Sequence, residues 1–148
     1  MARARLVGIN HVAIEVGDLD AALDLYARVF AFELRGRRPT MAWIDMGDQF
    51  LAVSQGRTQG PDVHRHFGLV VDDLGAAQAA AEEAGLTVRA SGRGGIDFRD
   101  PWGNLFQCVD YREIQFERTP GVRRALGIEA LAKSASAQQE IAERGFAG

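Results

Sequence analysis

The sequence contains very little cysteine and lysine, and it has no long apolar run. Cys108 is its single cysteine, which excludes an internal disulfide and any zinc site built from several cysteines. Lys133 is its single lysine, so arginine carries almost all of the positive charge. No run reaches membrane-spanning length, and neither an apolar signal region nor a small-residue cleavage site follows Arg3 and Arg5. We therefore expect a cytosolic protein with no membrane segment.

The composition is otherwise that of an ordinary globular protein. The chain has 148 residues, of which 47% are hydrophobic and 25% are charged, and this length suits one domain with its own core. The formal net charge of −3 provides no basic surface for a nucleic acid. We therefore expect a small molecule, and neither a nucleic acid nor a membrane, as the partner.

A segment near the start of the chain recurs at a constant offset. Residues 11–22 read HVAIEVGDLDAA, and residues 66–77 read HFGLVVDDLGAA. The two stretches share the histidine, the second valine, the aspartate, the leucine and the final pair of alanines. Such self-similarity indicates that one structural unit occurs twice.

Each copy opens with the alternation of a β-strand. In the first copy valine and isoleucine point to one side, while His11 and Glu15 point to the other. In the second copy His66 takes the place of His11. Asp18 and Asp73 then stand where a helix N-cap belongs, since their carboxylates can accept bonds from the first free backbone N–H groups.

A helix and three short strands follow in each copy. Turn residues separate strand candidates at about residues 33–37, 41–46, 49–54, 87–90, 96–99 and 105–110. The order is βαβββ twice, which predicts a single α+β domain over residues 1–111 with modules at about 8–55 and 62–111. One helix covers only one face of each sheet, so we expect the two tandem modules to form a cupped half-barrel with a concave site.

The segment from Asp100 to Gln107 reads DPWGNLFQ. It resembles the Asp-Pro-x-Gly-Asn-x-x-Glu signature of the vicinal-oxygen-chelate superfamily, which includes glyoxalases, bleomycin-resistance proteins and extradiol dioxygenases. The paired strand openings at His11 and His66 are similar to the same family, and the likeness covers about residues 8–111. It implies the repeated βαβββ fold, which supports many chemistries.

The resemblance also implies metal ligands on the first and last strand of each module. The matching positions are His11, His66 and Gln107, whereas the fourth position, aligned from the turn at residues 47–51, is Leu51 and cannot bind a metal. Two imidazoles and one oxygen donor suit a divalent Fe, Mn, Ni or Zn ion. Gln107 stands where the family has a carboxylate, so its neutral amide removes one negative charge from the ligand set.

Two further side chains are candidates for proton transfer. Glu15 shares a strand side with His11, and it is either a general base, an auxiliary ligand or a solvated strand residue. His64 precedes His66 by two positions, so on a strand it would share the same side as a third imidazole or a supporting partner. Cys108 falls on the side opposite Gln107, and we expect a buried, inert thiol there.

The preferred function is a metal-dependent, glyoxalase-like enzyme of lyase, isomerase or dioxygenase type that acts on a small oxygen-bearing substrate. Glu15 or His64 would then move protons. Leu51 disfavours glyoxalase I itself, and Gln107 disfavours an extradiol dioxygenase or a fosfomycin-type thiol transfer.

Two metal-free alternatives stay open. One is a bleomycin-resistance-like protein that sequesters an apolar or aromatic compound in a cup lined by Leu51, Val53 and Val70. The other is an enzyme that uses histidine acid–base chemistry in the same cup.

Residues 112–148 extend beyond the likeness and predict a helical tail. One helix would begin at Thr119 and Pro120, Gly127 would interrupt it, and a second helix would span residues 128–143. Because family members commonly pair as dimers, we expect a homodimer in which the tail packs against the second subunit. A lid over the site is the other role that the tail could take.

Overall fold

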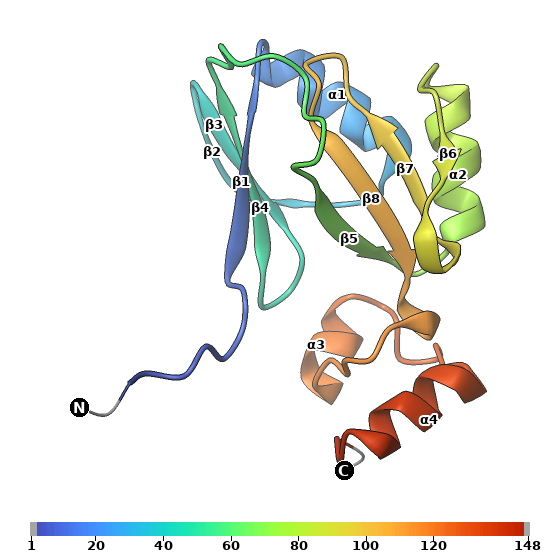
Figure 1. Ribbon diagram of the computed structural model, residues 1–148. Coiled ribbons are helices and arrows are strands. Elements are labelled where there is room, and N and C mark those ends of the chain that lie inside the picture. The colour runs from blue at the N-terminus through green and yellow to red at the C-terminus, as the bar shows by residue number, and fades with distance from the viewer. Residues whose placement is uncertain (1–2, 147–148) are drawn as a thin grey trace.

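The computed structural model describes residues 3–146 and shows the duplicated unit followed by helices (Figure 1). The first module consists of β1 (His11–Val16), α1 (Leu19–Val29), β2 (Leu34–Arg38), β3 (Met41–Asp45) and β4 (Phe50–Gln55). The second consists of β5 (Phe67–Val71), α2 (Leu74–Glu83), β6 (Arg89–Ala90), β7 (Ile96–Arg99) and β8 (Leu105–Asp110). The tail holds α3 (Pro120–Ala125) and α4 (Ala135–Glu143), and short 3-10 turns span Gly92–Gly94 and Tyr111–Glu113. The predicted α+β fold is confirmed.

Each module forms its own four-stranded sheet with the same topology. The strand orders are β1-β4-β3-β2 and β5-β8-β7-β6, and in each sheet the first strand is parallel to the last. Consequently β1 and β5 both lie at a sheet edge. The two edge strands run in opposite directions in Figure 1.

Both helices begin as the sequence predicts. The Asp18 carboxylate accepts a hydrogen bond from the Ala21 N–H at 2.9 Å, and the Asp73 carboxylate accepts one from Ala76 at the same distance. Each bond satisfies one of the backbone donors that a helix N-terminus leaves unpaired. The repeated aspartates therefore fix the same strand-to-helix junction in both modules.

The helices cover one face of the sheets and leave the other face open. In β1 Ile14 and Val16 are buried while His11, Ala13 and Glu15 are exposed, which confirms the predicted alternation. The buried faces meet in an aromatic cluster around Phe106, which is fully buried and contacts rings of both modules, namely Tyr26, Phe67 and Phe98. We call the sheet surfaces that point away from this core the open faces.

The N-terminal segment before His11 is not part of the first strand. β1 begins at His11. The partner strand β4 starts at Phe50, directly opposite His11, so residues 6–10 have no neighbouring strand to pair with. The segment extends away from the body (Figure 1), with Leu6 and Val7 almost completely exposed.

The second tail helix is shorter than predicted. Residues 128–134 are not helical, and α4 begins only after Ser134, whose hydroxyl accepts a bond from the Ala137 N–H. The Arg123 side chain instead donates to the backbone carbonyls of Glu129 and Leu131, which would otherwise be helix acceptors. Within residues 3–146, no helix combines the length and apolarity needed to cross a bilayer.

Candidate functional site

The candidate ligands lie on the open faces of the two sheets. His11 pairs with Phe50 in the register of β1 and β4, and its side chain is exposed. His66 immediately precedes β5 and is also exposed. Gln107 lies opposite Gly68 in the register of β5 and β8, and it is half-buried. The structure thus gives each sheet one histidine at the start of its edge strand.

The fourth ligand position is Ala52, which corrects the assignment to Leu51. Gln107 lies opposite Gly68, and the repeat offset makes Ala13 the counterpart of Gly68. Ala13 pairs with Ala52, whereas Leu51 pairs with Val12 and is buried in the core. The segment from Gly47 to Ala52 is one residue longer than the matching segment from Gly103 to Gln107. An alignment that starts at Gly47 therefore points to Leu51 instead of Ala52. Ala52 cannot bind a metal either, so this position still lacks a ligand.

The imidazole of His11 is held in a defined orientation. Its ring stacks on the Phe50 ring with centroids 4.6 Å apart and an angle of 8° between the planes. Its Nδ1 lies 2.8 Å from the Oδ1 oxygen of Asn10. When Nδ1 donates to that oxygen, Nε2 keeps its lone pair and is the ring nitrogen available to a ligand.

The imidazole of His66 has the same kind of support. Its Nδ1 lies 2.9 Å from the backbone oxygen of His64, so Nδ1 donates and Nε2 again keeps its lone pair. Strand alternation does not apply between His64 and His66, because residues 63–64 form a bend and β5 begins only at Phe67. His64 therefore supports His66 through its backbone carbonyl.

The amide of Gln107 is oriented by the carboxylate of Asp97, which the sequence analysis did not identify as part of the site. Asp97 lies opposite Gln107 in the register of β7 and β8, and its Oδ1 is 3.3 Å from the Gln107 Nε2. Since a carboxylate only accepts hydrogen bonds, the amide turns its nitrogen toward Asp97. The carbonyl oxygen of Gln107 is then the end of the amide that remains available as a donor atom.

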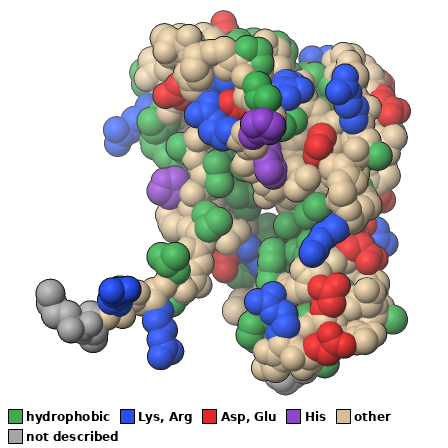
Figure 2. Space-filling model, in the orientation of Figure 1, with side chains coloured by type: hydrophobic (Ala, Val, Ile, Leu, Met, Phe, Trp, Pro, Cys, Tyr) green, Lys and Arg blue, Asp and Glu red, His purple; other side chains and the backbone are tan. Residues whose placement is uncertain are grey.

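One chain does not bring the candidate residues into one site. Glu15 and His66 line a common cavity of about 270 Å³, whereas His11 lines a separate cleft of about 680 Å³. Figure 2 likewise shows histidine side chains in two separate places on this face. Among residues 3–146 no group of three or more histidine, cysteine, aspartate or glutamate side chains could hold a metal ion.

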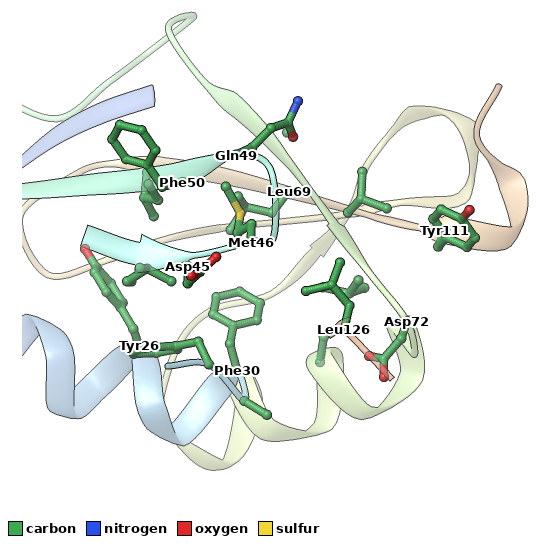
Figure 3. Close-up of a pocket in the computed structure, with 18 of the residues that line it drawn as sticks. Tyr26, Phe30, Asp45, Met46, Gln49, Phe50, Leu69, Asp72, Tyr111 and Leu126 are labelled. Atoms are coloured by element: carbon green, nitrogen blue, oxygen red, sulfur yellow. The ribbon is translucent and has the colours of Figure 1, made fainter. Parts of the chain in front are cut away.

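The larger cleft lies between the two modules and is mainly apolar. Its walls come from α1, α2, β5 and the β3–β4 turn, with Phe30, Met46 and Leu69 facing the same space (Figure 3). Of the three residues expected to line a cup, Leu51 and Val70 line this cleft, but Val53 is fully buried in the core.

The C-terminal tail closes one side of this cleft. Arg118 is the key residue of the closure, because its guanidinium donates to the Met46 carbonyl at 2.7 Å and to the Gln49 side chain at 3.0 Å, and it pairs with Asp48. Sequence reasoning missed this role, since only the folded chain brings the tail to the β3–β4 turn. The tail therefore contacts its own modules within one chain.

The turn at the start of the signature segment, residues 100–104, joins the two modules. Asp100 accepts a bond from the Tyr26 hydroxyl of the first module at 2.6 Å, and Asn104 donates to the Glu15 carbonyl at 2.9 Å. Burial raises the pKa of the Tyr26 hydroxyl, and the Asp100 charge raises it further. The tyrosine is therefore a neutral donor that ties α1 to the second module.

Cys108 is buried on the core side, as predicted. Burial raises the pKa of its thiol to about 12, and the Asp97 charge adds to the effect. A buried thiol with so high a pKa is almost entirely protonated at neutral pH, which disfavours a role as nucleophile or metal ligand.

The donor set itself suits a divalent ion. Two imidazole nitrogens, which are borderline donors, and one amide oxygen, which is a hard donor, make a set of the kind that Mn(II), Fe(II) and Zn(II) accept. The chemistry of the residues therefore fits a metal, whereas their placement in a single chain does not complete the site.

Solved structures of other proteins share this fold. The fosfomycin resistance protein FosX from Mesorhizobium loti is 22% identical, with 70% of this chain and 92% of that chain covered and a TM-score of 0.59. FosX from Listeria monocytogenes, solved with Mn(II) and sulfate, is 12% identical, with 82% and 99% covered and a TM-score of 0.62. A glyoxalase/bleomycin resistance protein/dioxygenase from Alicyclobacillus acidocaldarius is 25% identical, with 70% and 91% covered and a TM-score of 0.53.

A family model establishes the relationship at the level of sequence. It matches residues 8–108, which include both βαβββ modules up to the middle of β8. The match ends before the tail, so the residues that close the cleft lie outside it. The chain belongs to the Glyoxalase/Bleomycin resistance protein/Dioxygenase superfamily.

Proposed function

We propose that this protein binds a divalent metal ion through His11, His66 and Gln107 and acts on a small oxygen-bearing substrate. The observation that carries the proposal is the matched support of the two imidazoles: each Nδ1 lies 2.8–2.9 Å from an oxygen, an arrangement that favours the tautomer with a free Nε2. Metal-binding histidines typically have this arrangement. The fold shared with a FosX solved with Mn(II) supports the same proposal.

A bound ion would polarise a substrate oxygen and stabilise negative charge on it. The residues of the chain would supply the rest. Glu15 is an exposed carboxylate in the cavity that also contains His66, so it is positioned to accept a substrate proton there. Asp97 would keep the carbonyl oxygen of Gln107 turned toward the ligand.

We further propose that two copies of the chain complete the site. His11 begins β1, and His66 directly precedes β5. Because these two edge strands run in opposite directions, the histidines lie at opposite ends of this pair of strands (Figure 1). Both strands have a free edge, and Leu6 and Val7 in the arm before β1 are exposed. Free strand edges and exposed apolar chains favour pairing with another copy. His11 of one copy would then join His66 and Gln107 of the other.

Mixed dimers of two inactive variants test this arrangement. His11→Ala and His66→Ala should each abolish metal uptake, measured by elemental analysis after titration with Mn(II), Fe(II), Ni(II) and Zn(II). When the variants are co-expressed with different tags, the purified mixed dimer should regain one metal site, because one of its two sites then contains both histidines. His64→Ala is the matched control and should retain metal, since only its backbone carbonyl supports His66.

The outcomes separate the two parts of the proposal. Absence of metal uptake by the unmodified protein at micromolar concentrations would contradict the metal site itself. Uptake that both single variants lose, without recovery in the mixed dimer, would place the site within one chain.

Metal-free binding of a small apolar molecule is the second candidate function, and the cleft of about 680 Å³ favours it. Ligand sites in proteins commonly occupy about 300–1,000 Å³ and are mainly apolar with a few polar groups. Metal content and ligand uptake by the His66→Ala variant distinguish this candidate, because His66 does not line the cleft and cleft binding would not require the metal.

A further inference from the structure

The segment of residues 3–10, which we call the N-terminal arm, exposes large apolar side chains to water. Leu6 and Val7 are almost completely exposed, and Ile9 is 69% exposed. The arm pairs with no strand and extends away from the body (Figure 1). Exposed apolar side chains that lie together favour burial against a partner.

The cleft of about 680 Å³ between the modules is a second exposed apolar region. Three large apolar side chains that line it are themselves exposed to water, namely Val70, Phe116 and Leu126. Val70 belongs to β5 and the other two to the tail, so the body and the tail both border the cleft. Phe30, Met46 and Leu69 continue the apolar wall inside it (Figure 3).

The charges of the arm and of the cleft are opposite. Arg3 and Arg5 are the only charged residues of the arm. Asp72 and Asp73 line the cleft where β5 leads into α2, and both are exposed. Neither carboxylate forms an ion pair within residues 3–146, whereas Arg118 of the same lining is already paired with a carboxylate of the β3–β4 turn. The cleft therefore keeps negative charge that the arginines of an arm complement.

The path of the arm directs it toward another molecule. The Gln49 side chain donates to the Ile9 carbonyl at 3.0 Å, and this bond holds the base of the arm beside the cleft of its own chain. The rest of the arm continues away from that cleft and from the body (Figure 1). When extended, an arm of this length reaches about 26 Å, which is far enough to cross to a second copy.

We propose that the N-terminal arm of one copy binds in the cleft of a second copy, and that two copies exchange their arms in this way. Leu6 and Val7 pack against the apolar walls, and the two arginines of the arm lie beside Asp72 and Asp73. This inference rests on the proposed association of two copies and specifies the contact that holds them together. It requires no metal, and a bound arm occupies the space that a small molecule would otherwise fill.

Sedimentation velocity of the full chain, from nanomolar to high micromolar concentrations and with a chelator present, tests the arm. We expect the unmodified protein to form a dimer. Leu6→Ser/Val7→Ser should raise the dissociation constant at least about tenfold, because two apolar side chains lose their burial. Phe146→Ser is the matched control and should leave the constant unchanged, since Phe146 is 58% exposed but belongs to neither the arm nor the cleft.

Substitutions in α2 test the cleft. Ala80→Phe places a ring in the cleft and should weaken the dimer at least about tenfold, whereas Ala79→Phe, at an exposed position of the same helix that does not line the cleft, should not. The arm variant still has an intact cleft, and the Ala80→Phe variant still has an intact arm. When the two are mixed at a concentration where each alone is a monomer, they should form a heterodimer through one arm and one cleft. This recovery also shows that both variants are folded.

Charge reversal tests the polar part of the contact. Arg5→Glu should weaken the dimer about threefold, because its carboxylate then meets the aspartates of the cleft. Asp72→Lys in the same chain should recover this loss, since each arm meets the cleft of the other copy. Asp24→Lys, at an exposed carboxylate outside the cleft, is the control and should recover nothing.

The outcomes separate the arm contact from the rest of the proposed function. A dimer that persists unchanged in Leu6→Ser/Val7→Ser would overturn the arm contact and leave the association of two copies in place. Folded arm and cleft variants that stay monomeric on mixing would also overturn the arm contact. An unmodified protein that is monomeric at every concentration would overturn both. Because the chelator removes metal from these measurements, a failure of the metal site appears only in the elemental analysis.

Discussion

The two modules share one topology but differ in what they contribute. Helix α1 buries six residues, namely Leu19, Ala22, Leu23, Leu25, Tyr26 and Val29, whereas α2 buries only Ala77 and Ala81. On the open faces the difference is reversed: the second sheet has Gln107 and Asp97 where the first has Ala52 and Trp43. The two copies of the unit therefore have different roles. The first module supplies most of the core, and the second supplies most of the polar donors.

Matched leucine truncations should show the largest difference between the modules. Leu19 and Leu74 are the same position in the repeat, but Leu19 is 1% exposed while Leu74 is only half-buried. Leu19→Ala should lower the free energy of unfolding by about 3–4 kcal/mol, and Leu74→Ala by about 1 kcal/mol. Urea denaturation measures both values. Equal losses would show that the helices contribute equally to the core.

The linker between the modules should be the next most sensitive region, and its contribution should depend on pH. Asp62 is buried and accepts hydrogen bonds from Arg57 and Arg65. Burial alone would raise its carboxyl pKa, but these bonds together hold the pKa below its ordinary value. Asp62→Asn should therefore cost about 3 kcal/mol at pH 7, because it leaves the buried charge of Arg57 without its partner.

The sign of the pH effect follows from the lowered pKa. The stability that Asp62 contributes is present above its unfolded-state pKa, about 3.9, and is lost as the pH falls through the lower folded-state value. Unfolding measured between pH 7 and pH 3 should show the two proteins converging below about pH 4. Asp20→Asn, at an exposed pair with Arg37, is the control and should change little. A constant difference across this pH range would contradict the assignment to Asp62.

Carboxylates introduced at the two equivalent ligand positions, Gln107 and Ala52, should change the affinity for Mn(II). This is the smallest of the expected effects. Gln107→Glu should tighten Mn(II) binding by about tenfold, roughly 1.4 kcal/mol, because it adds an anionic donor beside Asp97. Ala52→Glu at the equivalent position should tighten it less, since Ala52 is buried and a carboxylate there must be desolvated. Isothermal titration compares the two variants. A larger gain for Ala52→Glu would mean that the first sheet, rather than the second, supplies the oxygen ligand.

Some site features were accessible from the sequence and others were not. The repeat offset alone pairs His11 with His66, and strand alternation alone places Cys108 opposite Gln107. Alternation does not apply at His64, because the chain bends before β5, and the alignment failed at Leu51 because the turn before β4 is one residue longer. Both cases concern turns, where side-chain direction depends on the backbone path and no longer on a fixed period.

The sequence by itself determined the duplicated βαβββ order, the two helix caps and the sides of the strands, because each depends on residues close together in the chain. Only the tertiary structure decided that Asp97 orients Gln107, that Arg118 closes a cleft and that His11 and His66 lie apart. The contact of Asp97 joins positions 10 residues apart, and those of Arg118 join positions 69 and 72 residues apart. Sheet register, the relative direction of the edge strands and the return of the tail set such contacts, and local patterns carry no information about them.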